Sequence, residues 1–524
     1  MTGERPYAGA LPAGRSQGSA RRGDAALAGL VFTAGLGSVA IEITASRLLQ
    51  PYFGSSTVVW ANIIGLVLAS LALGYWLGGR LADRRPSRRL LGGIVLTAAV
   101  LTAVVPFVAQ PFLDRAVQGI DDVSAGAVIG SFFGSLALFA PPVTLLGMVA
   151  PFAIRLVLAD VRSAGAVAGR FYALSTVGSL LGVFLPPLVT IPLVGTQRTF
   201  LGAAALIALG GALLVGRRWL LLAASLAALL ALPPGAVKAA EGLLYERESR
   251  YQFIQVVERG SARYLYLNEG VAVHSVWRPD EVLTGGVWDV FLALPPLLGR
   301  PVERVAILGN AGGTTARAYG VFYPRARIDG VELDPAVTDV GRRFFGLGDN
   351  PRLRVYDADA RPYLRWTRRR YDIIVVDAYR PPYVPFYLTT REFFRLARAR
   401  LRPGGLIALN VATVPGDRRL AEGVAASVAS EFPQVLTWQA LRFNQLVIGL
   451  SRAVGRRTLN RRLQTAPRRL RVLTQLLANQ LRPAAAAEPW TDDRAPVEWI
   501  TDRMIVEFAA RGGRFDEEPL PTNP

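Results

Sequence analysis

A glycine-rich run and an acidic residue some way after it are the first residues that suggest chemistry. The run Gly309–Gly313 follows the apolar stretch 304–308, and Glu332 closes the next apolar stretch, 328–332. Glycines let a backbone approach a nucleotide closely, and an acid at the end of the second strand can bind both ribose hydroxyls. This order predicts a nucleotide-binding site at the run and Glu332. The bland alternative is a tight turn without a ligand.

Two further carboxylates extend this pattern. Asp359 follows the third strand, where an adenine amino group would be met, and Asp377 follows the apolar strand 372–376. Parallel sheets place ligands and chemistry at the carboxyl ends of their strands. Asp377 could instead cap a helix, but the proline-rich loop 380–385 follows it where a cap would need a helix. We therefore expect Asp377 to be a functional residue.

The elements that would position these residues are strands alternating with helices. That alternation over residues 301–450 predicts a Rossmann-like parallel sheet covered by helices. Before it, the runs 251–257 and 262–267 alternate like paired strands around a short turn, so residues 240–300 are predicted to form a small β-domain. Residues 451–524 are interpreted as a basic C-terminal extension and tail.

The N-terminal half has a different composition and is predicted to be a multi-span α-helical membrane domain over residues 25–234. A span needs about 20 mostly apolar residues. Candidate spans lie at 25–49, 57–79, 90–110, 125–156, 170–194, 198–216 and 218–234. Six are supported by length, and the seventh is short. Residues 1–24 are polar and are interpreted as a disordered leader.

The side of the membrane follows from charge and chemistry. The loop 78–89 is rich in arginine and should be cytoplasmic. It also resembles a loop of major-facilitator transporters. If the seventh segment crosses, charge counting places the C-terminal domain outside the cell. If that segment lies in the interface, or if the fourth segment contributes an extra crossing, the domain is cytoplasmic, and we expect this placement on chemical grounds.

Composition excludes several classes of site. The chain has no cysteine and one histidine, His274, so thiolate chemistry and histidine-rich metal sites are excluded and no metal is expected. The formal net charge is +20. However, the arginines are dispersed, and many flank the apolar spans, as expected next to a lipid bilayer. A nucleic-acid partner is therefore disfavoured.

With these residues in view, the chain from about residue 245 to 411 resembles the spermidine synthase (polyamine aminopropyltransferase) family. As a whole it resembles the membrane-embedded bacterial branch of that family. The resemblance implies an aminopropyl transfer from decarboxylated S-adenosylmethionine to an amine. It also implies that Asp377 accepts the amine proton. The donor would be held by Gln252, Gly309, Gly312, Gly313, Glu332, Asp359, Ala360 and Pro385.

Departures from the family pattern concern the amine acceptor. Gly312 stands where the family has an aspartate, and Arg380 stands where it has a second catalytic acid. Trp288 or Asp289 occupies the place of a histidine, while His274 falls near a family glutamine. Replacing a carboxylate with arginine reverses the local field. Putrescine is therefore disfavoured as the acceptor, and the alternatives are an anionic or zwitterionic acceptor or another nucleoside-type donor. A homodimer is left open.

Two other readings remain. An S-adenosylmethionine-dependent methyltransferase would share the same sheet and the same use of Glu332. A membrane transport protein whose soluble domain senses a nucleoside without catalysis would tolerate loss of Asp377. A nicotinamide dehydrogenase is the least supported, because no hydride-handling residues stand out.

Overall fold

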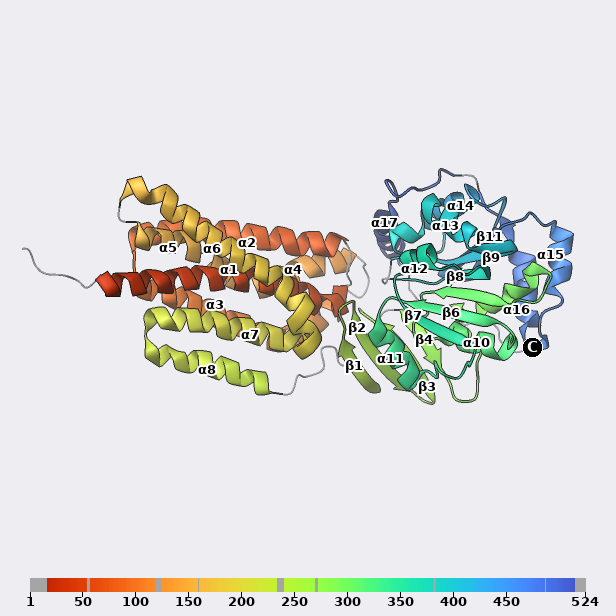
Figure 1. The fold of residues 1–524 in the computed structure, drawn as a ribbon, viewed down its shortest axis with the longest axis horizontal. Coiled ribbons are helices and arrows are strands. Elements are labelled where there is room, and N and C mark those ends of the chain that lie inside the picture. Colours follow the sequence, from red (N-terminus) through yellow and green to blue (C-terminus); the bar gives the residue numbers. More distant parts are fainter. Residues whose placement is uncertain are drawn as a thin grey trace, which may run out of the picture. The chain divides into compact units, whose positions relative to one another are not determined.

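The computed structural model describes residues 17–53, 57–118, 125–158, 160–232, 240–268, 272–379, 383–485 and 487–513. The chain divides into two compact units. The first comprises residues up to 45, 63–109 and 135–235, and it is helical. The second comprises 46–62, 110–134 and the chain from 236 onward, and it contains both sheets (Figure 1).

The first unit is built from long apolar helices. They are α1 (Gln17–Phe53), α2 (Thr57–Arg84), α3 (Arg88–Gln118), α4 (Ala125–Gly147), α5 (Val149–Val157), α6 (Ala164–Leu185), α7 (Ile191–Val215) and α8 (Leu220–Ala228). Within the described residues, five stretches are long and apolar enough to cross a membrane by length and composition: Asp24–Gln50, Val59–Arg84, Arg88–Ala109, Leu136–Val157 and Val161–Val215. The fifth contains two of the predicted spans, which meet at Gly195, where φ is +85°.

Two boundaries differ from the sequence prediction. Helix α1 begins at Gln17, so the end of the predicted leader is helical, while residues 1–16 lie outside the described part. The described part of the predicted span 218–234 consists of the end of a 3-10 turn, Arg217–Trp219, the nine-residue α8 and a second 3-10 turn, Leu229–Ala231. This stretch is not among the five candidate spans found in the described residues. Leu232 is extended because a proline follows it.

A four-stranded antiparallel sheet opens the second unit. Its strands are β1 (Leu243–Glu248), β2 (Phe253–Arg259), β3 (Ala262–Leu267) and β4 (Val273–Trp277), in the order β1-β2-β3-β4. Gly260, with φ of +60°, makes the tight turn between β2 and β3. Alternate residues of β2 and β3, such as Ile254 and Leu265, pack against Val337 and Val340 of helix α11 (Pro335–Phe344).

The second sheet has eight strands in the order β12-β10-β11-β9-β8-β5-β6-β7. Strands β7, β6, β5, β8 and β9 are parallel, and β11 runs antiparallel to β9. The bounds are β5 (Arg304–Leu308), β6 (Arg327–Glu332), β7 (Leu353–Asp357), β8 (Tyr371–Val376), β9 (Leu401–Ala412), β10 (Gln434–Leu441), β11 (Asn444–Leu450) and β12 (Arg482–Pro483).

Helices cover both faces of this sheet and bury a separate core on each face. They include α9 (Val287–Val290), α10 (Thr314–Phe322), α12 (Ala360–Trp366), α13 (Arg391–Ala399), α14 (Arg419–Ala429), α15 (Arg456–Leu463), α16 (Arg471–Gln480) and α17 (Val497–Ala510) (Figure 1). The second unit is therefore a doubly wound, Rossmann-like α/β fold, as the strand and helix pattern predicts.

The C-terminal extension belongs to this fold. Leu459 and Leu477 enter one core, and Met504 enters the other. Strand β12 also adds an edge to the sheet by pairing with β10. The region after residue 450, interpreted from the sequence as a basic extension, thus also contributes buried leucines between its arginines.

Candidate functional site

The predicted site residues gather where the strand order of the large sheet reverses. Strand β5 has β6 on one side and β8 on the other, and all three are parallel. The Gly309 N–H donates to the Val331 carbonyl oxygen at 2.9 Å, and the Asp377 N–H donates to the Leu308 carbonyl oxygen at 2.8 Å. These bonds bring the ends of the three strands together, in the place where such sheets bind ligands.

Gly309 allows the close approach of β5 and β8. Its φ is +87°, and a Cβ atom built there would lie 2.4 Å from the Asp377 carbonyl oxygen. No residue with a side chain fits this position without moving β8. The glycine therefore sets the distance between the loop and Asp377.

Glu332 ends β6 and is held by the glycine-rich loop itself. Its Oε2 accepts from the Ala311 N–H at 2.8 Å, and its Oε1 accepts from the Asp334 N–H at 3.1 Å. Burial raises the pKa of Glu332 to about 7, and the two N–H donors oppose that rise. The Leu333 N–H also bonds this carboxylate, which has about four acceptor positions. The carboxyl group is thus fixed in orientation and keeps acceptor capacity for a ligand hydroxyl.

Asn310 contributes an unfilled amide to the same loop. Its side chain is buried against Gly330 of β6, where a Cβ atom would lie 2.8 Å from the Asn310 Cγ. Within the described part of the chain, neither Oδ1 nor Nδ2 of Asn310 has a hydrogen-bond partner. A buried amide without partners costs free energy that a ligand or water can recover.

Gly312 is closed in by the small β-domain. Its N–H donates to the Ser275 Oγ of β4 at 2.8 Å. A Cβ atom at this position would lie 2.9 Å from the Ser275 Cβ and 3.1 Å from the Phe345 Cγ. The aspartate that the related family carries at this position therefore has no room in this arrangement. Gly313 follows at φ +88° and begins helix α10.

Gln252 lies beside the acidic end of β6. The Ser249 hydroxyl donates to the Asp334 Oδ2 at 2.5 Å, and the Gln252 side chain also hydrogen-bonds the Asp334 carboxylate. Burial raises the pKa of Asp334, while these bonds oppose that rise. Asp334 also caps helix α11 through the Ala336 N–H. Gln252 and Glu332 therefore both contact Asp334, at the end of β6.

Asp359 caps helix α12, in which Ala360 is the first, buried residue. One carboxylate oxygen of Asp359 accepts from the Arg361 N–H at 3.0 Å, and the other accepts from the Tyr387 hydroxyl at 2.9 Å. Pro385 immediately precedes Tyr387's short helical turn, Phe386–Leu388. The loop after β8 thus returns to the end of β7. Arg380 lies outside the described residues.

Asp377 is held by an amide pair that the sequence analysis missed. Its Oδ1 accepts from the Asn410 Nδ2 at 2.9 Å, and the Asn410 Oδ1 accepts from the Asn444 Nδ2 at 3.0 Å. The Tyr379 hydroxyl donates to the Asn410 carbonyl oxygen at 2.9 Å. Asn410 lies inside β9, two residues before its end, and its polar side chain directly after the apolar run 406–409 was the signal that could have found it.

The environment of Asp377 suits proton transfer near neutral pH. Burial raises its pKa to about 6, and the hydrogen bond from Asn410 opposes that rise. A carboxylate with a pKa near the working pH is an effective general base. Asp377 therefore has the chemistry expected of a group that accepts a proton from an attacking nucleophile.

Three other residues at positions that differ from the family pattern, Trp288, Asp289 and His274, have buried or partly buried side chains. Asp289 accepts from the N–H groups of Thr284 and Gly285 at 2.9 and 2.8 Å, and burial raises its pKa to about 6. Trp288 is buried beside it. Burial lowers the pKa of His274 to about 4, so its ring is neutral at pH 7. Among the residues that the structure describes, no three His, Cys, Asp or Glu side chains form a possible metal site.

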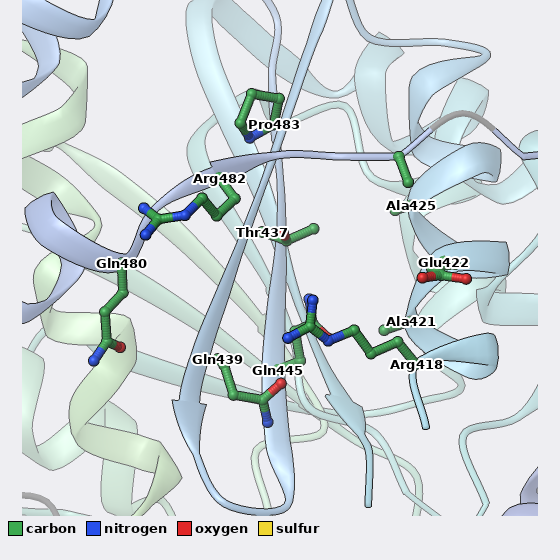
Figure 2. Close-up of a pocket in the computed structure, with 11 residues that line it drawn as sticks. Arg418, Ala421, Glu422, Ala425, Thr437, Gln439, Gln445, Gln480, Arg482 and Pro483 are labelled. Carbon is green, nitrogen blue, oxygen red and sulfur yellow. The ribbon is translucent and has the colours of Figure 1, made fainter. Parts of the chain in front are cut away.

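A separate cavity of about 410 Å³ lies near the β12 edge of the large sheet, between α14 and strands β10, β11 and β12. Figure 2 shows its polar lining, in which the side chain of Arg418, the residue before α14, extends toward the strands. None of the predicted site residues lines it. Strands β9 and β8 lie between β11 and β5 in the sheet order, so this cavity is distinct from the candidate site.

Comparisons with known proteins give the second unit a family context. Residues 292–440 match the spermine/spermidine synthase domain. A probable polyamine aminopropyl transferase of Bifidobacterium longum (strain NCC 2705) is 35% identical over 192 residues, which cover 36% of this chain and 42% of the relative. A polyamine aminopropyltransferase of Corynebacterium efficiens is 31% identical over 316 residues, covering 53% of this chain and 59% of the relative.

Among solved structures, a probable spermidine synthase from Corynebacterium glutamicum ATCC 13032 aligns with 55% of this chain and 100% of its own. The sequence identity is 18% and the TM-score is 0.38, which is too low to support an inference about activity.

The chain spans about half the length of the curated relatives it matches. The domain match includes the glycine-rich loop, Glu332, Asp359, Asp377 and Asn410, and it ends within β10. It leaves out the whole first unit and the small sheet that carries Gln252. The C-terminal part of this chain therefore carries a spermine/spermidine synthase domain.

Proposed function

We propose that this protein is a membrane-bound aminopropyltransferase. Its second unit would move an aminopropyl group from decarboxylated S-adenosylmethionine to an amine acceptor. The observation that carries the proposal is the placement of Asp377, with a pKa raised to about 6, at the same sheet edge as Glu332 and Asp359. The curated relatives, named as polyamine aminopropyltransferases, support the same reaction.

The reaction needs little beyond alignment and one base. The acceptor nitrogen forms a bond to the aminopropyl carbon next to the sulfonium. The carbon–sulfur bond breaks, and neutral methylthioadenosine leaves with the electron pair. The nitrogen then loses one proton to Asp377. Because the sulfonium is a good leaving group, holding a neutral amine in line accounts for most of the catalysis.

The donor would be held by the residues that the loop and strand ends gather. Glu332 would accept the two ribose hydroxyls, and Asp359 with the Ala360 N–H would meet the adenine edge. The rest of the donor site would be lined by Gln252, Gly309, Gly312, Gly313 and Pro385. The unfilled amide of Asn310 is a further candidate for a contact with the nucleoside.

The acceptor is proposed to be anionic or zwitterionic. Gly312 provides no carboxylate for a cationic amine, and Ser275 and Phe345 occupy the space that an aspartate would need. A di-cation such as putrescine would therefore lack one of the partners that the related family supplies. Turnover measured with putrescine and with small amino acids as acceptors tests this directly. Faster turnover with putrescine would contradict it.

The membrane location is supported by the five apolar stretches of the first unit. We propose that they anchor the enzyme in the cell membrane, with the synthase domain in the cytoplasm where the donor is made. C-terminal fusions to a reporter active only inside and to one active only outside decide the side. Activity of the outside reporter alone would contradict a cytoplasmic domain.

The test of the reaction uses the full-length protein in detergent. It would be mixed with decarboxylated or ordinary S-adenosylmethionine, and products would be followed by mass spectrometry. Methylthioadenosine from the first donor, abolished by Asp377→Asn, is the expected result. S-adenosylhomocysteine from the second donor would indicate the methyltransferase alternative, which the shared sheet and Glu332 keep open. Binding without turnover of either donor would favour a nucleoside sensor.

A further inference from the structure

A cavity of about 520 Å³ in the first unit lies where its longest apolar segment is interrupted. Helix α6 ends at Leu185, and a π-helical turn follows over Pro186–Thr190. Gly195 breaks the helix again within α7. Residues on both sides of these breaks line the cavity, together with Leu36 and Ala40 of α1. Interrupted helices are a common way for membrane proteins to build binding sites.

The cavity lining is apolar except for one cation and two hydroxyls. The hydroxyls are engaged within the wall, because the Thr199 hydroxyl lies 2.8 Å from the Gly195 carbonyl oxygen and 3.0 Å from the Thr190 Oγ1. The cation is Arg198, and none of the described lining residues is acidic. A positive charge without an acidic neighbour thus lines an apolar space.

Arg198 also has unused hydrogen-bonding capacity. Its Nε atom is buried and has no hydrogen-bond partner in the described part of the chain. Its Nη2 atom donates to the Leu232 carbonyl oxygen over a long 3.4 Å. Within a membrane domain, a guanidinium is costly unless an anion or water meets it. A planar guanidinium is well suited to a phosphate group.

We propose that this cavity binds an anionic phospholipid, with the phosphate on Arg198 and an acyl chain along the apolar wall. This proposal rests on the membrane location proposed above. The charge selects the headgroup, because Arg198 is the one charged residue in the described lining. The wall selects a chain, because Leu36, Val194 and Leu206 offer apolar surface that a hydrocarbon would cover.

The test begins with the full-length protein, retained in membranes after alkaline carbonate extraction and then purified in a mild detergent. It would be exposed to equal amounts of phosphatidylglycerol and phosphatidylcholine with matched acyl chains, and bound lipid counted by native mass spectrometry. We expect preferential retention of phosphatidylglycerol. Arg198→Gln should reduce that preference about fivefold, the effect of one cation near an anionic lipid.

Matched variants separate the charge from the cavity. Arg198→Lys should keep part of the preference. Arg217→Gln, at an exposed arginine outside the lining, should leave it unchanged. Gly202 lines the cavity, and a Cβ atom added there meets no atom within 4 Å. Gly202→Leu should therefore fill the space without moving the wall, and should reduce retention of both lipids.

The outcomes distinguish this proposal from its alternatives. Equal retention of both lipids by the wild type, or full preference in Arg198→Gln, would overturn it. Competition by glycerol phosphate as strong as that by phosphatidylglycerol would show an anion site that makes no use of the acyl chain, and would also overturn it. Release of the protein by carbonate would instead contradict the membrane location, which is a separate failure.

Discussion

The hydrogen bond from Asn410 should set the pH at which Asp377 works. The Asn410 Nδ2 lies 2.9 Å from the Asp377 Oδ1, and this bond opposes the rise in pKa that burial causes, so that the pKa of Asp377 is about 6 with the bond in place. Hydrogen bonds to charged groups contribute about 1.5–3 kcal/mol. One pKa unit corresponds to about 1.4 kcal/mol, so Asn410→Leu should raise the pKa of Asp377 by about one to two units.

The consequence is a loss of activity that depends on pH. Asp377 acts as a base only when ionised. If its pKa moves from about 6 to about 7, its ionised fraction falls about fivefold at pH 6 and about twofold at pH 7, and hardly changes at pH 9. The variant should therefore be poor in mild acid and should recover in base.

The assay is release of methylthioadenosine from decarboxylated S-adenosylmethionine at saturating donor, from pH 5.5 to 9. Dividing the rate of Asn410→Leu by that of the wild type at each pH removes the titration of the acceptor itself. Asn444→Leu is the matched control, because Asn444 contacts Asn410 and has no hydrogen bond to Asp377. It should give a smaller shift. A loss of the same size at every pH would refute a role of Asn410 in tuning Asp377.

Three further predictions follow from the same site. Asp377→Asn should abolish turnover. It should also raise the free energy of unfolding by about 1–3 kcal/mol at pH 8, measured by thermal unfolding, with little gain at pH 4. The reason is that folding raises the pKa of the Asp377 carboxyl, so its ionisation opposes folding only at pH values above the pKa that it has in the unfolded chain. Glu332→Gln leaves one loop N–H without its acceptor, so methylthioadenosine should bind about tenfold more weakly by calorimetry, and unchanged affinity would argue against ribose at Glu332. Gly312→Ala should cost about 1–3 kcal/mol through its 2.9 Å contact with Ser275, whereas Gly348→Ala, with open space around it, serves as control; equal unfolding midpoints would contradict the packing argument.

The large sheet was predictable because its strands carry two kinds of signal. Strands β5 and β8 are mostly apolar, as expected for strands buried on both faces. Each is followed directly by a residue that is not apolar. Gly309 and Asp377 mark those ends. Because parallel strands end at the same edge, the order along the chain was enough to place both residues near Glu332.

The remaining parts depended on contacts that no local pattern encodes. Ser275 reaches Gly312 from a different sheet, and Asn444 reaches Asn410 from a neighbouring antiparallel strand. Both are small polar residues without a motif around them. The edge strand β12 has only two residues, too few to show an alternation of apolar and polar side chains. Long-range pairing decided each of these positions.

The packing around Gly312 connects the sequence departure to the proposed change of acceptor. Losing the aspartate of the related family could in principle leave an open space that a cationic amine still fills. Here the space is closed, since the Gly312 N–H is bonded to Ser275 and a Cβ atom would contact Ser275 and Phe345. Restoring the carboxylate therefore requires room as well as charge. Gly312→Asp alone should misfold the loop, whereas Gly312→Asp with Ser275→Gly should fold and gain turnover with putrescine. If the double variant folds but gains nothing, the choice of acceptor is made elsewhere in the site.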